Sequence, residues 1–246
     1  MRNVDNLSGS MSLVGPDVQD VIDEPVVLER MLPIDDARVL ELGCGAAEKT
    51  QILAERKDVA EIVAAEVDAV QHSKNLDLTG LDKITFKSYG AENIQEPDAS
   101  FDIVLMFKSL HHVPLENMDN ALMEIHRVLK PGGFAYISEP VFAGAFNEVM
   151  RVFHDEEEVR RGAFEAMQRA VSERQFDLRE EYFFRNRIRM ESWEQYKQNI
   201  IDVTHTEHRL DEVQLAEVER RFYVNRSSEG FVFEIPNRVD LLVRLS

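Results

Sequence analysis

Two glycines follow a short apolar segment and have an acidic residue beside them. Residues 38–42 read Arg-Val-Leu-Glu-Leu and run directly into Gly43-Cys44-Gly45. Glycine permits a sharp turn and leaves room for a ligand against the backbone, and the helix that follows offers unpaired N–H groups. Glu41 lies two residues before the first glycine, where a carboxylate would repel a pyrophosphate and attract a positive amino or sulfonium group. The pattern therefore predicts a bound cationic small molecule.

Further carboxylates follow the next two apolar segments. Glu66 stands at the end of the segment 61–67, and Gly90-Ala91-Glu92 comes after the segment 84–89. A carboxylate at the end of the second strand of a nucleotide-binding fold is placed to accept hydrogen bonds from ribose hydroxyls. Asp68 is better explained as the N-cap of the next helix. These positions favour a nucleoside lying across the strand ends.

A third group of polar residues follows the fourth and fifth apolar segments. His111, Glu139 and His112 are the candidates for a general base, although a hydrogen-bonded structural role for His111 stays open. Lys108 is unfavourable beside a sulfonium, so we expect it to point at an acidic substrate group or to extend into solvent. Adjacent histidines seldom point the same way, and the His-x-x-His pattern at 205–208 is weak, so we predict no metal site.

The elements that must position these residues alternate in type. Short apolar strands and helical segments succeed one another at the spacing of βαβ units, which predicts a parallel sheet with right-handed crossovers. The expected strands are 38–42, 61–67, 84–89, 101–107 and 134–138, and the expected helices are 25–31, 47–56, 69–76 and 115–129.

The second half of the chain has a different pattern of apolar and charged residues. Residues 141–180 have helical spacing, 182–190 alternate apolar residues with arginine as an edge strand would, and 193–203 and 211–222 are helical again. Two final strands, 231–235 and 239–245, are expected on either side of Pro236. We therefore divide a single domain, 1–246, into an N-terminal helical segment (1–35), a ligand-binding core (36–140), a helical cap insertion (141–222) and terminal strands (223–246).

The arginines of the expected edge strand share one face. Arg185, Arg187 and Arg189 are two residues apart, so their side chains lie on the same side of a strand. Surface ion pairs are the simpler explanation of such arginines, but this face, or Lys108, could also bind an acidic group of a substrate.

The composition limits the possible partners. The chain has 246 residues, 28 basic and 46 acidic, with a net charge of −18. A field of this sign repels nucleic acid and anionic membrane surfaces. Cys44 is the single cysteine, which excludes an internal disulfide and a cysteine-rich zinc site. There is no secretory signal at the start and no apolar run of about 18 residues, so we expect a cytoplasmic protein with a small-molecule partner.

Six blocks in this order resemble the class I S-adenosylmethionine (SAM)-dependent methyltransferases, in particular the ubiquinone/menaquinone-biosynthesis branch and its small-molecule relatives. The blocks are Glu-Leu-Gly-Cys-Gly (41–45), Glu-Val-Asp (66–68), Gly-Ala-Glu (90–92), Ser-Phe-Asp-Ile-Val-Leu (100–105), Leu-His-His-Val (110–113) and Glu-Ile-His-Arg-Val-Leu-Lys-Pro-Gly-Gly (124–133). The resemblance covers about residues 36–140 and implies an α/β fold with a Rossmann-like sheet of seven strands, one of them antiparallel, flanked by helices.

The resemblance also implies a cofactor, SAM, and roles for single residues. Glu41, Gly43 and Gly45 would line its methionine part, and Glu66 would hold the ribose. Val67, Ala91 and Glu92 would lie near the adenine, and Lys108 would lie beside the methyl donor. The implied reaction is the in-line transfer of a methyl group to a small molecule, with His111 or Glu139 as the candidate base.

The chain departs from the family pattern at two positions, and two other functions remain as alternatives. Ala47 replaces a glycine that the family often has, and Gly90 replaces an aspartate that binds the adenine amino group, so Glu92 or the backbone would take over that contact. A nicotinamide-dependent oxidoreductase is the first alternative, but Glu48 stands where its third glycine would be. The second alternative is a SAM-binding partner or regulatory protein without catalytic activity.

Overall fold

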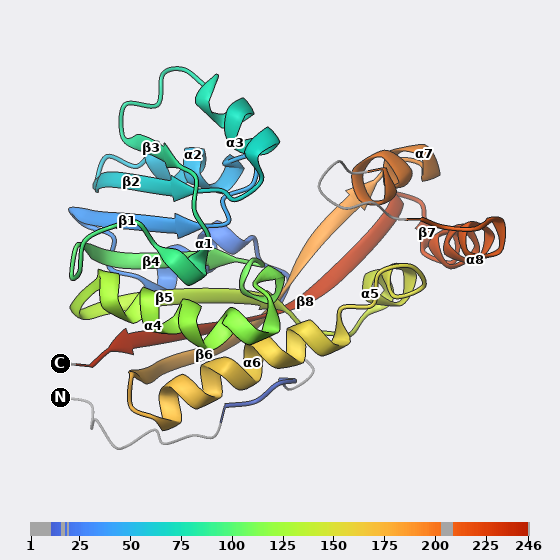
Figure 1. Cartoon of the computed structure of the whole chain (residues 1–246). Helices are drawn as coiled ribbons and strands as arrows, with labels where there is room; N and C mark the ends of the chain where they lie inside the picture. The colour runs from blue at the N-terminus through green and yellow to red at the C-terminus, as the bar shows by residue number, and fades with distance from the viewer. Residues whose placement is uncertain (1–10, 16–17, 19, 203–208, 246) are drawn as a thin grey trace.

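A mixed sheet forms the centre of the molecule (Figure 1). The computed structural model describes residues 11–15, 18, 20–202 and 209–245. The strand order is β3-β2-β1-β4-β5-β8-β6, and the two-residue β7 pairs with β8. The strands are β1 (Ala37–Leu42), β2 (Val59–Ala65), β3 (Ile84–Lys87), β4 (Phe101–Phe107), β5 (Leu129–Pro140), β6 (Phe176–Met190), β7 (Arg226–Ser227) and β8 (Gly230–Arg244).

The directions of the strands confirm the expected topology. Strands β1 to β5 pair in parallel, and β8 runs antiparallel to both β5 and β6. One strand of the seven is therefore reversed, as the resemblance implied. Because the carboxyl ends of parallel strands meet at one edge, the segments after β1, β2, β4 and β5 lie at the same edge of the sheet.

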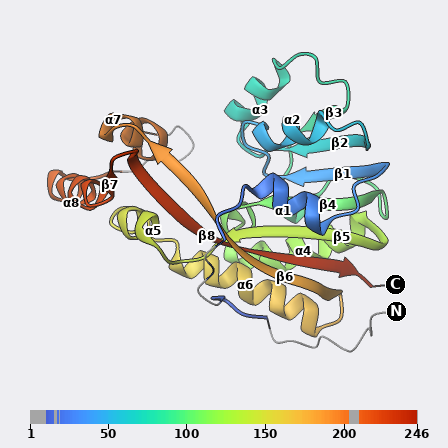
Figure 2. The same ribbon diagram turned by 180° about the vertical axis from the view of Figure 1, so that it is seen from behind.

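Helices cover both faces of the sheet. Helix α1 (Glu24–Met31) packs on one face (Figure 2), where Val27 and Leu28 join an apolar cluster with residues of β1 and β4. The opposite face carries α4 (Met118–Val128) and α6 (Glu157–Ser172) over a second cluster. Helices α2 (Glu48–Ala54) and α3 (Ala69–Leu76) follow β1 and β2. Short 3₁₀ helices stand at Ala91–Asn93, Leu110–His112 and Leu115–Asn117.

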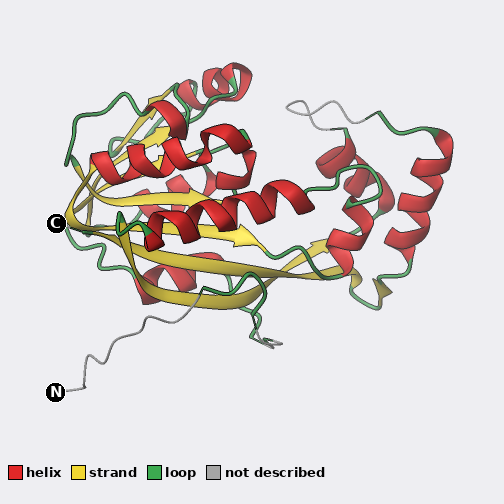
Figure 3. Ribbon diagram, turned by 60° about the horizontal axis from the view of Figure 1, so that its bottom comes forward, coloured by secondary structure: helices red, strands yellow, loops and turns green. Residues whose placement is uncertain are grey.

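The cap is carried by strands as well as helices. The outer ends of β6 and β8 extend beyond the sheet and hold α5 (Ala145–Met150), α7 (Trp193–Tyr196) with a π-helical turn at Lys197–Ile201, and α8 (Glu212–Tyr223) (Figures 1 and 3). These elements share an apolar cluster of their own, centred on Phe222 and Tyr196. The expectation of a helical segment through residue 180 was wrong, because Phe176 already begins β6, at the edge of the sheet.

Pro236 does not divide the last strand, contrary to the sequence interpretation. β8 is continuous from Gly230 to Arg244. The carbonyl of Pro236 accepts a hydrogen bond from the N–H of Val141, one residue past the end of β5. Its nitrogen faces the same side, where the neighbouring strand has ended, so the missing N–H removes no bond of the sheet.

Among the described residues, no helix is long and apolar enough to span a membrane.

Candidate functional site

The glycine turn after β1 leaves open space above one of its residues. The N–H groups of Gly43 and Cys44 both donate to the carbonyl of Ala65, at 2.9 and 3.0 Å. Both glycines have positive φ, +71° at Gly43 and +53° at Gly45. A Cβ at Gly43 would lie 2.7 Å from that of Ser109, whereas a Cβ at Gly45 would meet nothing within 4 Å. Gly43 is thus required by packing, and Gly45 leaves room for a ligand.

Glu66 lies against this turn. Its Oε2 accepts a hydrogen bond from the N–H of Gly45 at 2.8 Å, and its Oε1 accepts one from the N–H of Asp68 at 2.9 Å. Asp68 itself caps α3 by accepting from Val70 and Gln71, as the sequence predicted. A carboxylate has about four acceptor positions, so Glu66 keeps the capacity to bind further donors such as ribose hydroxyls.

Glu41 is a buried carboxylate with one partner. Its side chain accepts a hydrogen bond from the hydroxyl of Thr50 at 2.6 Å. Burial raises the pKa of Glu41 to about 7, against the effects of Thr50 and Lys49. Burial, with the charges of Glu41 and Glu66, also raises the pKa of Cys44 to about 12, so both carboxylates act on the same turn. A buried carboxylate of this kind gains from a positive group nearby.

The segment after β3 places an acidic side chain where an aspartate is missing. A Cβ built on Gly90 would meet both carboxylate oxygens of Glu92, so Glu92 folds back over this position. Ala91 is buried, and its side chain packs in an apolar cluster. Val67, which follows Glu66, is 64% exposed. Glu92 thus lies beside the position of the missing aspartate, and its contact with an adenine stays a prediction.

Lys108 points away from the strand ends and toward α1. Its Nζ lies 2.6 Å from Oε2 of Glu24, a residue at the start of α1 that is only 4% exposed. The other oxygen of Glu24 has no hydrogen-bond partner in the described part of the chain. The positive charge of Lys108 is therefore already balanced, and sequence reasoning missed Glu24 because its partner lies 84 residues away.

His111, on the 3₁₀ turn after β4, lies between two carboxylates. Its Nδ1 hydrogen-bonds Glu139 of β5, and its Nε2 lies 3.7 Å from Oε1 of Glu156. Burial alone would lower the pKa of His111, but Glu139 and Glu156 outweigh it and raise the pKa to about 9. His111 is 4% exposed. The sequence offered His111 and Glu139 only as separate candidates for a base, and the structure brings the two together.

His112 lies beside His111 instead of pointing away from it. The two ring centroids are 4.1 Å apart, because the 3₁₀ turn brings adjacent side chains together. His112 remains exposed to solvent. Partial desolvation and the charge of His111 lower the pKa of His112 to about 4. The sequence-based objection to two cooperating histidines therefore does not hold here.

The cap side completes this cluster with Glu156, the residue that precedes α6. Glu156 hydrogen-bonds Arg160, and its Oε1 lies 2.9 Å from Nε2 of His154. Burial would raise the pKa of Glu156, but His111, His154 and Arg160 together lower it strongly. No pattern in the sequence singles out this residue, since the acidic run 155–158 is typical of a solvated helix surface. Residues 203–208, with the second histidine pattern, lie outside the described residues.

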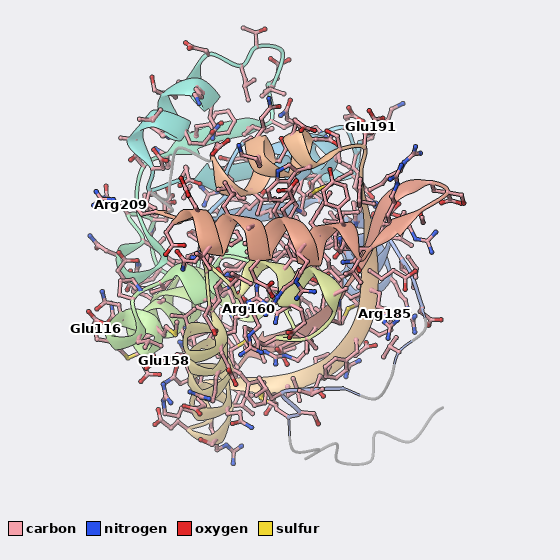
Figure 4. The ribbon with its side chains drawn as sticks, turned by 90° about the vertical axis from the view of Figure 1, so that its right-hand side faces the viewer. Glu116, Glu158, Arg160, Arg185, Glu191 and Arg209 are labelled. Carbon is pink, nitrogen blue, oxygen red and sulfur yellow. The ribbon has the colours of Figure 1, made fainter. Side chains whose placement is uncertain are left out.

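The arginine face of β6 lies beside a cavity of about 480 Å³. Arg185 and Glu234 line this cavity together with apolar residues such as Val141, Phe183 and Pro236. Arg185 and Arg187 both bind Glu234, at 3.4 and 2.8 Å. Figure 4, seen from the cap end, shows Arg160 near the middle of the molecule and Arg185, a residue of β6, further out.

Comparison with known proteins identifies the part of the chain that holds the glycine turn. Residues 40–137 match the family model described as a methyltransferase domain. The chain is 34% identical over 112 residues to 27-O-demethylrifamycin SV methyltransferase of Amycolatopsis mediterranei, which covers 43% of this chain and 40% of that protein. It is 30% identical over 125 residues to the ubiquinone/menaquinone biosynthesis C-methyltransferase UbiE of Hydrogenovibrio crunogenus, over 44% and 46% of the two chains. The chain thus matches less than half the length of these relatives.

Solved structures show the same fold over most of the chain. The YcgJ protein of Bacillus subtilis superposes with a TM-score of 0.66 at 17% identity, over 90% of this chain and 97% of that one. The [4+2]-cyclase SpnF superposes with a TM-score of 0.55 at 19% identity, over 90% and 79%. At these identities the likeness concerns the fold alone.

Proposed function

We propose, from the premise that residues 40–137 belong to the class I SAM-dependent methyltransferases, that this protein transfers a methyl group from SAM to a small-molecule acceptor. The observation that carries the proposal is the pair of carboxylates, Glu41 and Glu66, on a turn with open space above Gly45. This arrangement fits a cationic amino acid joined to a ribose. It does not fit a dinucleotide, because Glu48 at the start of α2 and Glu41 would both face the pyrophosphate.

The residues of the chain would each contribute binding or orientation. SAM, when bound, supplies an electrophilic methyl group on sulfur. Glu41 would balance the positive methionine end, Glu66 would hold the ribose hydroxyls, and Glu92 would bind the adenine amino group. Fixing both reactants in line contributes about 7–11 kcal/mol to catalysis in favourable cases. For an acceptor that carries a proton, we propose that His111, oriented by Glu139, accepts this proton.

We also propose that the acceptor has an acidic group, which Arg185 binds in the cavity beside β6. The cavity has the size and the mainly apolar walls of a small-molecule site. The substrate group would exchange with Glu234, the present partner of Arg185. Lys108 is the less favoured candidate because its partner Glu24 is buried. Unchanged acceptor affinity in both Arg185→Met and Lys108→Met would exclude an acidic group.

Isothermal titration calorimetry with S-adenosylhomocysteine (SAH) tests the cofactor site. We expect the wild-type protein to bind SAH and Glu66→Gln to bind it about 10–100-fold more weakly, the effect of losing hydrogen bonds to a charged group. Glu61→Gln is the matched control on the same strand, since Glu61 is half-exposed and pairs with Arg38. Wild-type protein that is folded and gives no heat with SAH would refute the proposal. Binding without turnover over a panel of acceptors would instead favour the non-catalytic alternative.

A further inference from the structure

The cluster around His111 has the donor atoms and spacing of a metal site. His111, His112 and Glu156 each offer one ligand atom, and these atoms lie within 4.8 Å of one another. Two of the three residues, His111 and Glu156, are buried, whereas His112 is exposed and leaves the site open to solvent. They come from two parts of the molecule, the turn after β4 and the residue before α6, so the site exists only in the folded chain.

The distance between Glu156 and His111 is close to that expected between neighbouring ligands. Oε1 of Glu156 lies 3.7 Å from Nε2 of His111. Bonds of about 2.0–2.1 Å to a tetrahedral zinc ion separate neighbouring ligand atoms by about 3.3 Å. An ion could therefore enter with small movements of the side chains.

The residues that hydrogen-bond the donor side chains also fit a metal site. Metal-bound histidines commonly donate their second ring N–H to a carboxylate, which orients the ring and makes it a better ligand. Nδ1 of His111 has such a partner in Glu139. The second oxygen of Glu156 hydrogen-bonds Arg160, and Arg160 also binds Asn147 of α5 at 3.2 Å. Both buried donors are therefore held in place by neighbours that do not themselves need to bind the ion.

We propose that His111, His112 and Glu156 bind a divalent transition-metal cation such as Zn²⁺, with the fourth position open to solvent or to the acceptor. Imidazole nitrogens with one carboxylate select zinc, iron or cobalt, whereas Mg²⁺ and Ca²⁺ prefer oxygen donors throughout. This proposal departs from the expectation from sequence that the chain has no metal site. An ion here would connect the core to the cap through its ligands.

The chemical role of the ion rests on the proposed methyl transfer, although its binding does not. A cation bound beside the acceptor would favour the deprotonated form of an acceptor hydroxyl. His111 would then be a ligand and not a proton acceptor, because Nε2 cannot bind an ion and a proton together. Metal binding thus decides between the two roles of this residue.

Calorimetry with the chelator-treated, full-length protein tests this site. We expect one equivalent of Zn²⁺ to bind and Mg²⁺ at the same concentration to give no heat. Co²⁺ bound to these ligands should add visible absorption bands. Glu156→Gln and His112→Gln should each weaken Zn²⁺ binding by at least about tenfold, and Glu139→Gln by about 10–100-fold through its effect on His111.

His126→Gln is the matched control, since His126 lies on α4 against the ring of Phe176. It should bind Zn²⁺ as the wild type does. SAH titration of each variant separates loss of the fold from loss of the ion. A wild-type protein that binds SAH and takes up no Zn²⁺ would overturn the metal site and leave the proposed function standing. Equal Zn²⁺ affinity in Glu156→Gln, His112→Gln and the wild type would overturn it as well.

Discussion

The two ends of the candidate active site are built in different ways. At the cofactor end, the glycine turn, Glu41 and Glu66 come from β1, β2 and the segments that follow them, and Glu66 binds the backbone of the turn directly. At the acceptor end, His111 follows β4 and Glu139 lies near the end of β5, where it hydrogen-bonds both His111 and the backbone N–H of Leu110, and Glu156 approaches His111 from the cap segment before α6. The first end is fixed by the backbone of the sheet, and the second also depends on where the segment before α6 lies.

This difference explains why one end can be predicted from the sequence more easily than the other. Backbone contacts to a common ligand require particular residue types at fixed spacing, so they leave a short pattern in the sequence. Contacts between side chains of distant elements require only that the folded chain brings them together. The type of cofactor is therefore evident from the sequence, whereas the chemistry at the acceptor end is not.

The largest effect is expected from a variant that destabilises the cap and leaves the cofactor end intact. Phe222 is fully buried, and its ring centroid lies 4.1 Å from that of Phe231 and 5.0 Å from that of Tyr196. Phe222→Ala should lower the free energy of unfolding of the cap by about 3–5 kcal/mol, because it leaves a cavity in a small apolar cluster. Urea denaturation measures this loss. Val213→Ala, on the exposed side of the same helix, should change it by less than about 0.5 kcal/mol.

The same variant tests whether the ends are independent. If the cofactor end is held by the sheet, Phe222→Ala should bind SAH with wild-type affinity. A parallel loss of SAH affinity would show that the cap also shapes the cofactor end.

A smaller effect should distinguish ligand contact from backbone strain at Gly45. A side chain at its φ of +53° costs about 1–2 kcal/mol of stability, and a methyl group would also fill the open space above the turn. Gly45→Ala should therefore lose both stability and SAH affinity. Gly80→Ala is the control, because Gly80 has a φ of +76° and equally open surroundings but lies away from the turn. It should lose similar stability in thermal unfolding and keep its affinity. Equal SAH affinity in both variants would exclude a ligand above Gly45.

The smallest effect concerns the pH dependence of cofactor binding. Burial raises the pKa of Glu41 from 4.5 to about 7, so its proton stabilises the folded state below pH 4.5, and this contribution is lost as the pH rises through 7. The ammonium group of SAH, if it lies beside Glu41, favours the ionised form of this carboxyl group. SAH affinity should therefore increase about tenfold between pH 6 and pH 8 in calorimetric titrations. Glu41→Gln should remove this slope, and a slope that persists in the variant would assign it to another group.

The order of the core elements could be predicted from the sequence. The errors concern the bounds of strands whose extent depends on the neighbouring strand. Strand β4 and helix α3 have the predicted bounds, because strong apolar patterns and the Asp68 cap define them locally. Pro236 was expected to break a strand, but the strand continues since β5 ends beside it. The start of β6 at Phe176 was missed because its residues also fit the pattern of a helix.

The sequence by itself determined the kind of fold and the placement of Glu41 and Glu66 at the ends of neighbouring strands. Apolar periodicity and the glycine turn are local properties of the chain, and a parallel sheet brings its strand ends to one edge without further information. Only the tertiary structure decided that Lys108 pairs with Glu24 and that Glu156 reaches His111 from the cap. The physical reason is that an ion pair between distant residues depends on packing geometry, and charged residues at these positions look the same in sequence whether they are buried or exposed to solvent.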